Sequence, residues 1–355
     1  FHFDGLRLDA VHAISDDGRP HFLETLAQRV RAANLPRDIH LVLENEHNQA
    51  GWLARDTRGR AIAYDAQWND DVHHVLHVAA TGESEGYYAD YRREEPSQLG
   101  RALAEGFAYQ GGHMHYRGAT RGEPSAHLPP TAFVAFIQNH DQIGNRALGE
   151  RLSALCRPQA LRALAATYLL LPQVPMLFMG EEWATTRPFQ FFCDFGGELA
   201  DKVRAGRREE FARFAAFQDP ATRARIPDPL AEATFLASKL DWSELEQPEH
   251  AAWLAWYRDL LGVRMRHLVP RLPGIQRAGR FRALGPGAVQ VQWECAAGQH
   301  AARRALLSLA VNLHDAPAAG CAALQRTDEL LWQEGEAPDH GTLAPWSVRC
   351  WLQPR

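Results

Sequence analysis

Three apolar segments of this 355-residue chain each read as a β-strand that runs into an acidic residue. The first is Gly5-Leu-Arg-Leu-Asp9, in which Arg7 and Asp9 share one face because strand side chains alternate between faces. The second is Leu41-Val-Leu-Glu44, and the third runs from Phe133 to Asp141. Strands that each deliver a carboxylate at their C-terminal ends are typical of the active-site face of a (β/α) barrel.

Longer motifs carry a resemblance to a known family. They are Asp65-Ala-Gln-Trp-Asn-Asp-Asp-Val-His-His74, Glu85-Gly-Tyr-Tyr-Ala-Asp90, Gln138-Asn-His-Asp-Gln-Ile-Gly-Asn-Arg146, and Phe178-Met-Gly-Glu-Glu-Trp183 with Pro188-Phe-Gln-Phe-Phe-Cys-Asp194. With the three strand ends, they resemble the α-amylase-type glycoside hydrolases, and among these the malto-oligosyltrehalose trehalohydrolases. The resemblance implies hydrolysis of the α-1,4 bond next to the terminal trehalose of a malto-oligosyltrehalose, an α-glucan substrate, retention of anomeric configuration and no cofactor.

The expected fold is α/β: a partial (β/α)₈ TIM barrel in residues 1–267 and a small antiparallel β-domain, a β-sandwich, in residues 268–355. The strands expected before the last long helix lie around residues 3–9, 39–44, 61–66, 132–139 and 175–179. The resemblance makes them about strands 4 to 8 of a barrel that has eight. Because the chain opens at Phe1 inside a strand, and because the family's first signature has no counterpart here, we expect an N-terminally truncated chain.

Other elements follow from periodicity and turn residues. Apolar residues at three- and four-residue steps predict a helix over 21–32, and further helices are expected over 71–80, 162–171 and 253–266. The stretch 82–125 is rich in Gly, Tyr and His and is expected to be a long functional loop. Short alternating runs after residue 268 predict the strands of the C-terminal domain.

Cleavage of a glycosidic bond needs a proton donor for the leaving oxygen and a second carboxylate that attacks the sugar. Asp9 and Glu44 are the predicted pair, with Asp9 ionised beside the Arg7 cation as nucleophile and Glu44 protonated as acid. The resemblance gives Asp141 the role of binding sugar hydroxyls in the distorted transition state. The alternative is that such acids cap helices or pair with Arg, and three of them at strand ends make that alternative improbable.

The segment from Trp68 to His74 offers acids, histidines and a flat indole face for a disaccharide. The predicted substrate-binding residues are Arg7, His12, Trp68, Asp70, Asp71, His73, His74, His140, Gln142 and Asn145. A metal site at His73 and His77 is the weaker interpretation, because this i, i+4 pair supplies only two ligands and lacks the H-E-x-x-H acid. For His77 alone, a satisfied helix histidine is favoured.

Several interpretations stay open. Tyr87, Tyr88 and Tyr91 either stack on glucose units or belong to the core of the loop, and Phe189, Phe191 and Phe192 carry the same ambiguity with a tilt towards substrate. The rival functions are an α-glucan branching enzyme, which is a transferase with the same three carboxylates, and a catalytically silent carbohydrate-binding fragment.

Composition excludes other classes of partner. The net charge of −5 and pI near 6.4, with Arg residues interleaved with acids, argue against nucleic-acid binding. No apolar run is long enough to suggest a membrane partner. The five cysteines are widely spaced and form no C-x-x-C pair, which predicts neither a disulfide framework nor a zinc site and favours a reducing cytoplasm.

Overall fold

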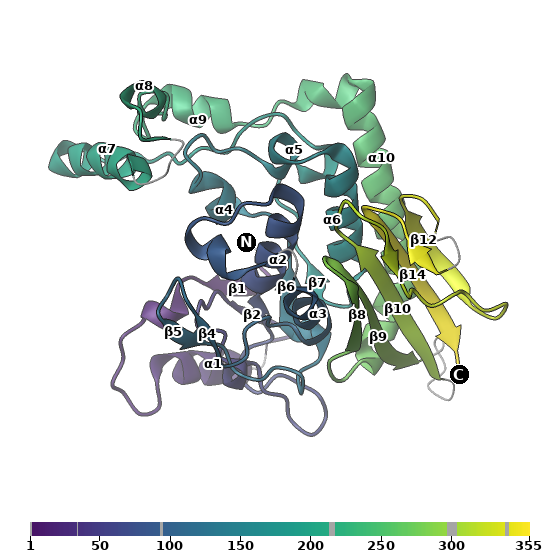
Figure 1. Cartoon of the computed structure of the whole chain (residues 1–355). Helices are drawn as coiled ribbons and strands as arrows, with labels where there is room; N and C mark the ends of the chain where they lie inside the picture. The colour runs from purple at the N-terminus through teal and green to yellow at the C-terminus, as the bar shows by residue number, and fades with distance from the viewer. Residues whose placement is uncertain (1, 34, 93–94, 213–216, 297–303, 338–340) are drawn as a thin grey trace. The chain divides into compact units, whose positions relative to one another are not determined.

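The computed structural model describes residues 2–33, 35–92, 95–212, 217–296, 304–337 and 341–355 (Figure 1). The chain forms two compact units. The first consists of Phe1–Ile137, Arg162–Met176 and Leu260–Arg355, and the second of Gln138–Leu161 and Leu177–Asp259. Among the described helices, none combines the length and apolarity that crossing a bilayer requires.

A five-stranded parallel sheet organises the first unit, with strand order β1-β2-β3-β6-β7. Its strands are β1 (Gly5–Leu8), β2 (His40–Leu43), β3 (Ala66–Trp68), β6 (Phe133–Ala135) and β7 (Val174–Pro175). Three of them, β1, β2 and β6, lie within the predicted ranges, whereas β7 meets the predicted 175–179 only at Pro175. The sequential order of neighbours is that of successive βα units in a (β/α) barrel.

The third strand does not lie at 61–66 as predicted, because β3 begins only at Ala66. Before it, Ala61 forms just an isolated bridge with Arg55. The Arg55 guanidinium donates to the carbonyls of Tyr64 at 3.2 Å and Asp65 at 2.6 Å. Carbonyls held by a side chain are not available to a neighbouring strand, so this segment approaches the sheet as a loop.

Helix α1 (Phe22–Ala32) covers the outward face of the sheet. His21 caps it, since its Nδ1 accepts from the Leu23 N–H at 3.1 Å. Leu23 and Ala27 are buried in one cluster with Leu41 and Leu43 of β2. Because strand side chains alternate, this packing turns Val42 and the residue after the strand, Glu44, to the opposite face of the sheet.

The stretch 82–125 is more ordered than predicted. After helix α2 (Asp70–Thr81) it contains a 3₁₀ turn, helix α3 (Pro96–Glu105) and the hairpin of β4 (Gly112–Met114) with β5 (Ala119–Arg121). Helix α3 packs on the C-terminal sheet (Figure 1). At this contact Gly100 lies against the Phe281 ring. The prediction of a plain loop was wrong because this contact partner lies far away in the sequence.

The C-terminal part folds as the predicted antiparallel β-domain within the first unit. A five-stranded sheet has the order β12-β14-β10-β9-β8, and β11 pairs with β13 in a second sheet. The bounds are β8 (Arg280–Gly285), β9 (Ala288–Ala296), β10 (Arg304–Asn312), β11 (Ala318–Ala319), β12 (Glu329–Glu334), β13 (Thr342–Leu343) and β14 (Ser347–Pro354). The domain boundary at residue 268 stays a prediction.

The second unit is helical in its described residues. Helices α6 and α10 each continue into the first unit. The helices are α4 (His140–Gly144), α5 (Leu152–Leu155), α6 (Pro158–Leu170), α7 (Gly197–Ala212), α8 (Pro220–Arg223), α9 (Glu232–Ser238) and α10 (Pro248–Val263). The predicted helices over 162–171 and 253–266 correspond to α6 and α10.

Candidate active site

Asp9 and Glu44 follow directly on neighbouring parallel strands. The register pairs Arg7 with Val42 and Leu8 with Leu43. Beyond the strands, the Glu44 N–H donates to the Leu8 carbonyl at 2.9 Å and the Val11 N–H donates to the Glu44 carbonyl at 3.1 Å, so the ladder extends past both acids. Adjacent strands lie about 4.8 Å apart. The two carboxylates therefore leave the same edge of the sheet side by side.

The Glu44 carboxylate is fixed by the backbone next to Asp9. Its Oε2 accepts from the Ala10 N–H at 2.6 Å. Ala10 has φ 42° and ψ 45°, a left-handed conformation that is unfavourable for a residue with a Cβ. Backbone strain of this kind costs about 1–3 kcal/mol and tends to occur at functional sites. The strained turn directs the Ala10 amide at Glu44.

Arg7 contacts both Asp9 and an aromatic ring. Its guanidinium forms an ion pair with the Asp9 carboxylate and lies 4.0 Å from the centroid of the Trp68 ring. The Asp9 side chain is 77% exposed, whereas that of Arg7 is 25% exposed. The indole stabilises the cation by a cation–π contact. Arg7 is thereby held on the sheet face that carries Asp9, and the carboxylate stays open to an incoming ligand.

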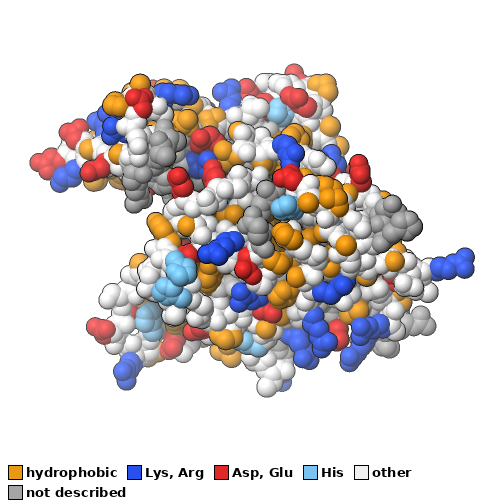
Figure 2. Space-filling view, in the orientation of Figure 1, with side chains coloured by type: hydrophobic (Ala, Val, Ile, Leu, Met, Phe, Trp, Pro, Cys, Tyr) orange, Lys and Arg blue, Asp and Glu red, His pale blue; other side chains and the backbone are white. Residues whose placement is uncertain are grey.

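His12 belongs to a polar cluster at the same edge. The Glu46 N–H donates to His12 Nδ1 at 3.3 Å, while His12 Nε2 lies 3.4 Å from the Glu46 carboxylate. Arg117, on the turn of the β4–β5 hairpin, pairs with the same carboxylate. Partial burial, with the charges of His12 and Arg121, lowers the pKa of His47. Figure 2 shows histidine side chains gathered on the surface in the region of this hairpin.

Asp71, predicted to bind substrate, lies inside the protein. The residue is 0% exposed and accepts from five donors. They are Asn48 Nδ2 at 3.0 Å, the Tyr91 hydroxyl at 2.5 Å, the Ala108 and Tyr109 N–H groups at 2.7 and 3.1 Å, and Arg121 Nη1 at 2.6 Å. With both oxygens occupied, this carboxylate has no face left for a sugar. The prediction of direct contact is corrected: Asp71 ties four chain segments together.

Arg121 is the charge partner of Asp71 and is also buried. Burial alone lowers the pKa of a guanidinium, but the Asp71 charge and the interactions with Tyr91 raise the pKa of Arg121 above its usual value. The Arg121 guanidinium is thus charged inside the protein. Such a pair is stable only when further hydrogen bonds satisfy its remaining polar atoms, as they do here.

Three histidines of α2 pack with tyrosines of the following turn. His73 has its Nδ1 2.7 Å from the Ile137 carbonyl and its Nε2 2.9 Å from the Tyr88 hydroxyl. His77 stacks on Tyr88 at 4.3 Å, and its Nε2 lies 2.8 Å from the Glu83 carboxylate. His73 and His77 are therefore core histidines, as favoured for His77 and contrary to the substrate contact predicted for His73.

His74 is enclosed by the rings of Tyr87, Tyr88 and Tyr91, at centroid distances of 5.2, 5.5 and 4.7 Å. Burial, together with the charges of the neighbouring basic residues, lowers the pKa of His74 well below its usual value. Tyr88 and Tyr91 are buried, whereas Tyr87 is partly exposed. Of these tyrosines, the two buried ones belong to the core of the loop.

The remaining residues of this segment are more accessible. Trp68 and Asp70 are half-buried, Trp68 at the end of β3 and Asp70 at the first position of α2. Trp68 also contacts Phe136 edge-on at 5.8 Å. In the register, Ala66 pairs with Val42, which in turn pairs with Arg7. Trp68 lies two residues after Ala66, so its side chain is on the same face of the sheet as Arg7 and Asp9.

The predicted residues of the Asn-His-Asp motif lie in the second unit, on helix α4. Asn139 caps the helix, its Oδ1 accepting from the N–H groups of Asp141 at 2.8 Å and Gln142 at 3.2 Å. Asp141 is exposed, and its Oδ1 accepts from Asn145 Nδ2 at 2.8 Å. His140 and Asn145 are exposed as well, and Gln142 is half-buried. The motif therefore presents polar groups to solvent.

The sequence did not predict the residues that hold Glu44 and the turn after β2 in place. Ala10, Gln67 and Arg121 each contact Glu44 or the turn after β2, and Asn48 connects that turn to Asp71. Only Gln67 gives a signal in the sequence, as a polar residue between Ala66 and Trp68. No local pattern indicates what they bind.

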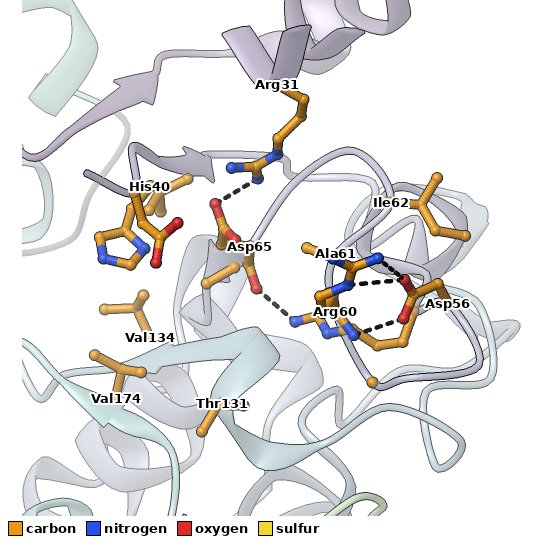
Figure 3. Close-up of a pocket in the computed structure, with 15 residues that line it drawn as sticks. Arg31, His40, Asp56, Arg60, Ala61, Ile62, Asp65, Thr131, Val134 and Val174 are labelled. Carbon is orange, nitrogen blue, oxygen red and sulfur yellow. Dashed lines mark hydrogen bonds and ion pairs between the residues drawn. The ribbon is translucent and has the colours of Figure 1, made fainter. Parts of the chain in front are cut away.

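A hollow of about 1140 Å³ opens at the other ends of the strands (Figure 3). Its lining includes His40 and Ala66, at the starts of β2 and β3, and Val174 of β7. Arg31 crosses it to Asp65 at 2.7 Å. Because Asp9 and Glu44 follow the C-terminal ends of β1 and β2, this hollow is not the site of the predicted chemistry. Among the residues described, no group of three or more His, Cys, Asp or Glu side chains could hold a metal ion.

Comparison with known proteins gives related sequences over most of the chain. A malto-oligosyltrehalose trehalohydrolase of Deinococcus radiodurans is 44% identical over 279 residues, which is 78% of this chain and 44% of that protein. The enzyme of the same name from Brevibacterium helvolum is 38% identical over 364 residues, covering 98% of this chain and 57% of that protein. Residues 276–350 match a domain of unknown function, DUF3459.

The crystal structure of a candidate alpha amylase from Salmonella typhimurium has a TM-score of 0.90 and 41% identity, and covers 99% of this chain and 57% of that one. The predicted resemblance to malto-oligosyltrehalose trehalohydrolases is thus confirmed, and so is the predicted α-amylase-type fold with a C-terminal β-domain. The chain spans about half the length of the curated relatives it matches, 44% and 57% for the two above.

Proposed function

We propose that this chain, a relative of the malto-oligosyltrehalose trehalohydrolases, acts in hydrolysing the α-1,4 bond next to the terminal trehalose of a malto-oligosyltrehalose. The products are trehalose and a malto-oligosaccharide. The observation that carries the proposal is the placement of Asp9 and Glu44 at adjacent ends of β1 and β2, supported by relatives 38% to 44% identical that bear this enzyme's name. The parallel sheet is proposed to be part of a (β/α)₈ barrel.

In the first step, the Asp9 carboxylate attacks the anomeric carbon while Glu44 gives its proton to the departing glycosidic oxygen. A covalent glycosyl-enzyme forms, and free trehalose leaves. In the second step, Glu44 takes a proton from water, whose oxygen replaces Asp9 at the anomeric carbon. A separation of about 5–5.5 Å between the two carboxyl groups suits this route, and neighbouring strands supply a spacing of that size.

Other residues act in binding. Asp141 keeps the role that the family resemblance gives it, holding sugar hydroxyls more tightly in the transition state than in the ground state. Trp68 offers the accessible part of its indole to a sugar ring on the face of Arg7 and Asp9. Asp71 and His73 support the site from the interior, whereas the half-buried His74 keeps its predicted role in binding the sugar. The chemistry needs no cofactor, and the free thiols of all five cysteines suit the proposed cytoplasmic location.

The test is to incubate the natural protein that carries this chain with maltopentaosyl-trehalose and, separately, with maltopentaose. We expect trehalose and maltopentaose from the first substrate, and much slower cleavage of the second. New α-1,6 branches on a longer glucan would instead indicate a branching transferase. Binding of either sugar without turnover would indicate a silent carbohydrate-binding protein. Equal rates of cleavage for the two sugars would contradict the proposed specificity for the trehalose end.

A further inference from the structure

The turn that follows Glu44 is clamped by buried polar side chains. It spans Asn45 to Asn48 and is closed by the Asn48 N–H, which donates to the Asn45 carbonyl at 3.2 Å. Asn45 and Asn48 are each 1% exposed, and Asn48 has φ 52°, a left-handed conformation. Glu46 is half-buried and His47 is exposed, but the backbone carbonyls of the turn that face the interior must find donors inside the protein. The donors here come from two elements other than β2.

Gln67, from β3, supplies the first donor. Its Nε2 donates to the Asn45 carbonyl at 3.0 Å and to Asn48 Oδ1 at 3.1 Å, and the residue is 0% exposed. Asn48 in turn donates from Nδ2 to Asp71 at 3.0 Å. The turn is thereby connected to the neighbouring strand and to helix α2 at once.

Arg121, from β5, supplies the second donor. Its Nε donates to the Glu46 carbonyl at 2.8 Å, while its Nη1 binds Asp71 at 2.6 Å and Tyr91 at 2.5 Å. The donors of a guanidinium lie in one rigid plane, so the contact of Nη1 with Asp71 also fixes the position of Nε, which donates to the Glu46 carbonyl. The buried ion pair therefore fixes the backbone two residues beyond Glu44.

These contacts hold Glu44 from both sides. On the strand side, the Glu44 N–H is bonded to Leu8 of β1, and the Glu44 carbonyl to Val11 in the 3₁₀ turn after β1. On the far side, the carbonyls of Asn45 and Glu46 are bonded to Gln67 and Arg121. An acid must lie within hydrogen-bond reach of the oxygen that it protonates, and a misplacement of 1 Å can cost about 100-fold in rate.

We propose that Arg121 and Gln67 are positioning residues for proton donation by Glu44. They touch neither substrate nor reacting atoms, and they act by fixing the turn that carries the acid. This inference rests on the proposed hydrolase function and specifies which half-reaction the two residues serve. They serve the breaking of the C1–O bond, in which the Glu44 proton passes to the leaving oxygen while Asp9 bonds to C1.

The experiment compares two leaving groups in the natural protein. Maltopentaosyl-trehalose releases a sugar alcohol that requires the proton of Glu44, whereas α-maltosyl fluoride releases fluoride with little help from an acid. The variants are Arg121→Lys, which keeps a cation near Asp71 but cannot keep the fork, and Gln67→Met, which removes the amide at similar volume and leaves no charge unpaired. The quantity measured is kcat/KM for each substrate.

We expect each variant to lose about 10- to 100-fold in kcat/KM on the trehalose substrate and to change little on the fluoride. The matched control is Tyr91→Phe, which removes a hydroxyl from the same buried network without touching the turn. That variant should leave the ratio of the two kcat/KM values unchanged. A merely structural role for Arg121 and Gln67 would lower both values in parallel in Arg121→Lys and Gln67→Met.

Equal losses on the two substrates in Gln67→Met and Arg121→Lys would overturn the proposal. If Arg121→Lys fails to fold, as judged by its circular dichroism, Gln67→Met decides the matter alone. Failure of the proposed function has a different signature, because the unmodified protein would then release no trehalose from maltopentaosyl-trehalose, whatever its rate on the fluoride.

Discussion

Asp9 is the single residue on which the proposed chemistry depends most. Replacing it by Ala removes the nucleophile, and with it a whole covalent step, so turnover should fall by about 10⁴-fold or more. Because the side chain is 77% exposed, the fold should be unaffected. Steady-state hydrolysis and a thermal melt measure the two effects. Asp4→Ala is the control, since Asp4 is an exposed acid on the same segment with its own arginine partner, Arg37. Comparable activity in the two variants would contradict the assignment.

Asp71 is predicted to matter for stability and not for direct sugar contact. Asp71→Ala leaves the Arg121 charge buried without its partner, which should cost about 3–5 kcal/mol in the free energy of unfolding. Urea denaturation measures this loss. The double variant Asp71→Leu with Arg121→Met should recover part of it, because no uncompensated charge remains. An Asp71→Ala protein of unchanged stability but altered sugar selectivity would restore the original prediction of direct binding.

His74 should make the fold sensitive to acid. Its pKa in the folded state is depressed well below the usual 6.5, chiefly by burial. Between the depressed value and 6.5 the unfolded chain binds a proton that the folded chain does not, so stability is fully present above about pH 6.5 and falls as the pH drops. His74→Phe keeps a ring among the tyrosines and removes the titrating group.

We therefore expect the loss of unfolding free energy between pH 7.5 and pH 5.5 to be smaller in His74→Phe than in the unmodified protein. Guanidinium denaturation at the two pH values provides the measurement. The exposed His113, replaced by Gln, is the matched control and should leave the pH dependence as it was. A His74→Phe protein with the same acid sensitivity would show that this ring is not the proton acceptor.

Asp71 and Arg121 also show which features of individual residues the sequence could not predict. Asp9 and Glu44 could be predicted, because strand alternation and the strand end are local features. The burial of Asp71 could not, because its partner Arg121 lies 50 positions away on a hairpin that no periodicity indicates. A polar residue in a polar segment looks like a ligand contact until the charge that faces it is known.

The same distinction applies to the secondary-structure elements. Strand β10 (Arg304–Asn312) is among the strands that the alternating runs after residue 268 predict, and β1 and β2 lie within the predicted ranges. Strand β3 was misplaced because Arg55 holds the carbonyls before it. Helix α3 was missed because its packing surface is Phe281 of the C-terminal sheet. Elements specified by their own pattern were found, and those specified by a distant side chain were not.

The contact between α3 and β8 gives a prediction at this scale. A Cβ at Gly100 would lie 2.1 Å from a ring carbon of Phe281, so Gly100→Ala forces the ring to move. Overpacking of this kind costs about 1–3 kcal/mol, and the higher helix propensity of Ala offsets part of that cost, so the fold should be destabilised. Gly206→Ala in α7 is the matched control, because a Cβ there meets no atom within 4 Å. That change should stabilise its helix by up to about 1 kcal/mol. Melting temperatures that shift in the same direction would contradict this reading of the interface.

At the scale of the whole molecule, the spacing of the strands in the sheet predicts the anomeric form of the released sugar. Adjacent parallel strands are about 4.8 Å apart, which suits the 5–5.5 Å of a retaining pair and not the 6.5–9.5 Å that an inverting enzyme leaves for water. With Asp9 as nucleophile and Glu44 as acid, the malto-oligosaccharide released from maltopentaosyl-trehalose should first appear as its α-anomer. Proton NMR, recorded before mutarotation mixes the anomers, distinguishes the two outcomes. Early appearance of the β-anomer would mean that water attacks directly, and the assignment of Asp9 as a covalent nucleophile would then be wrong.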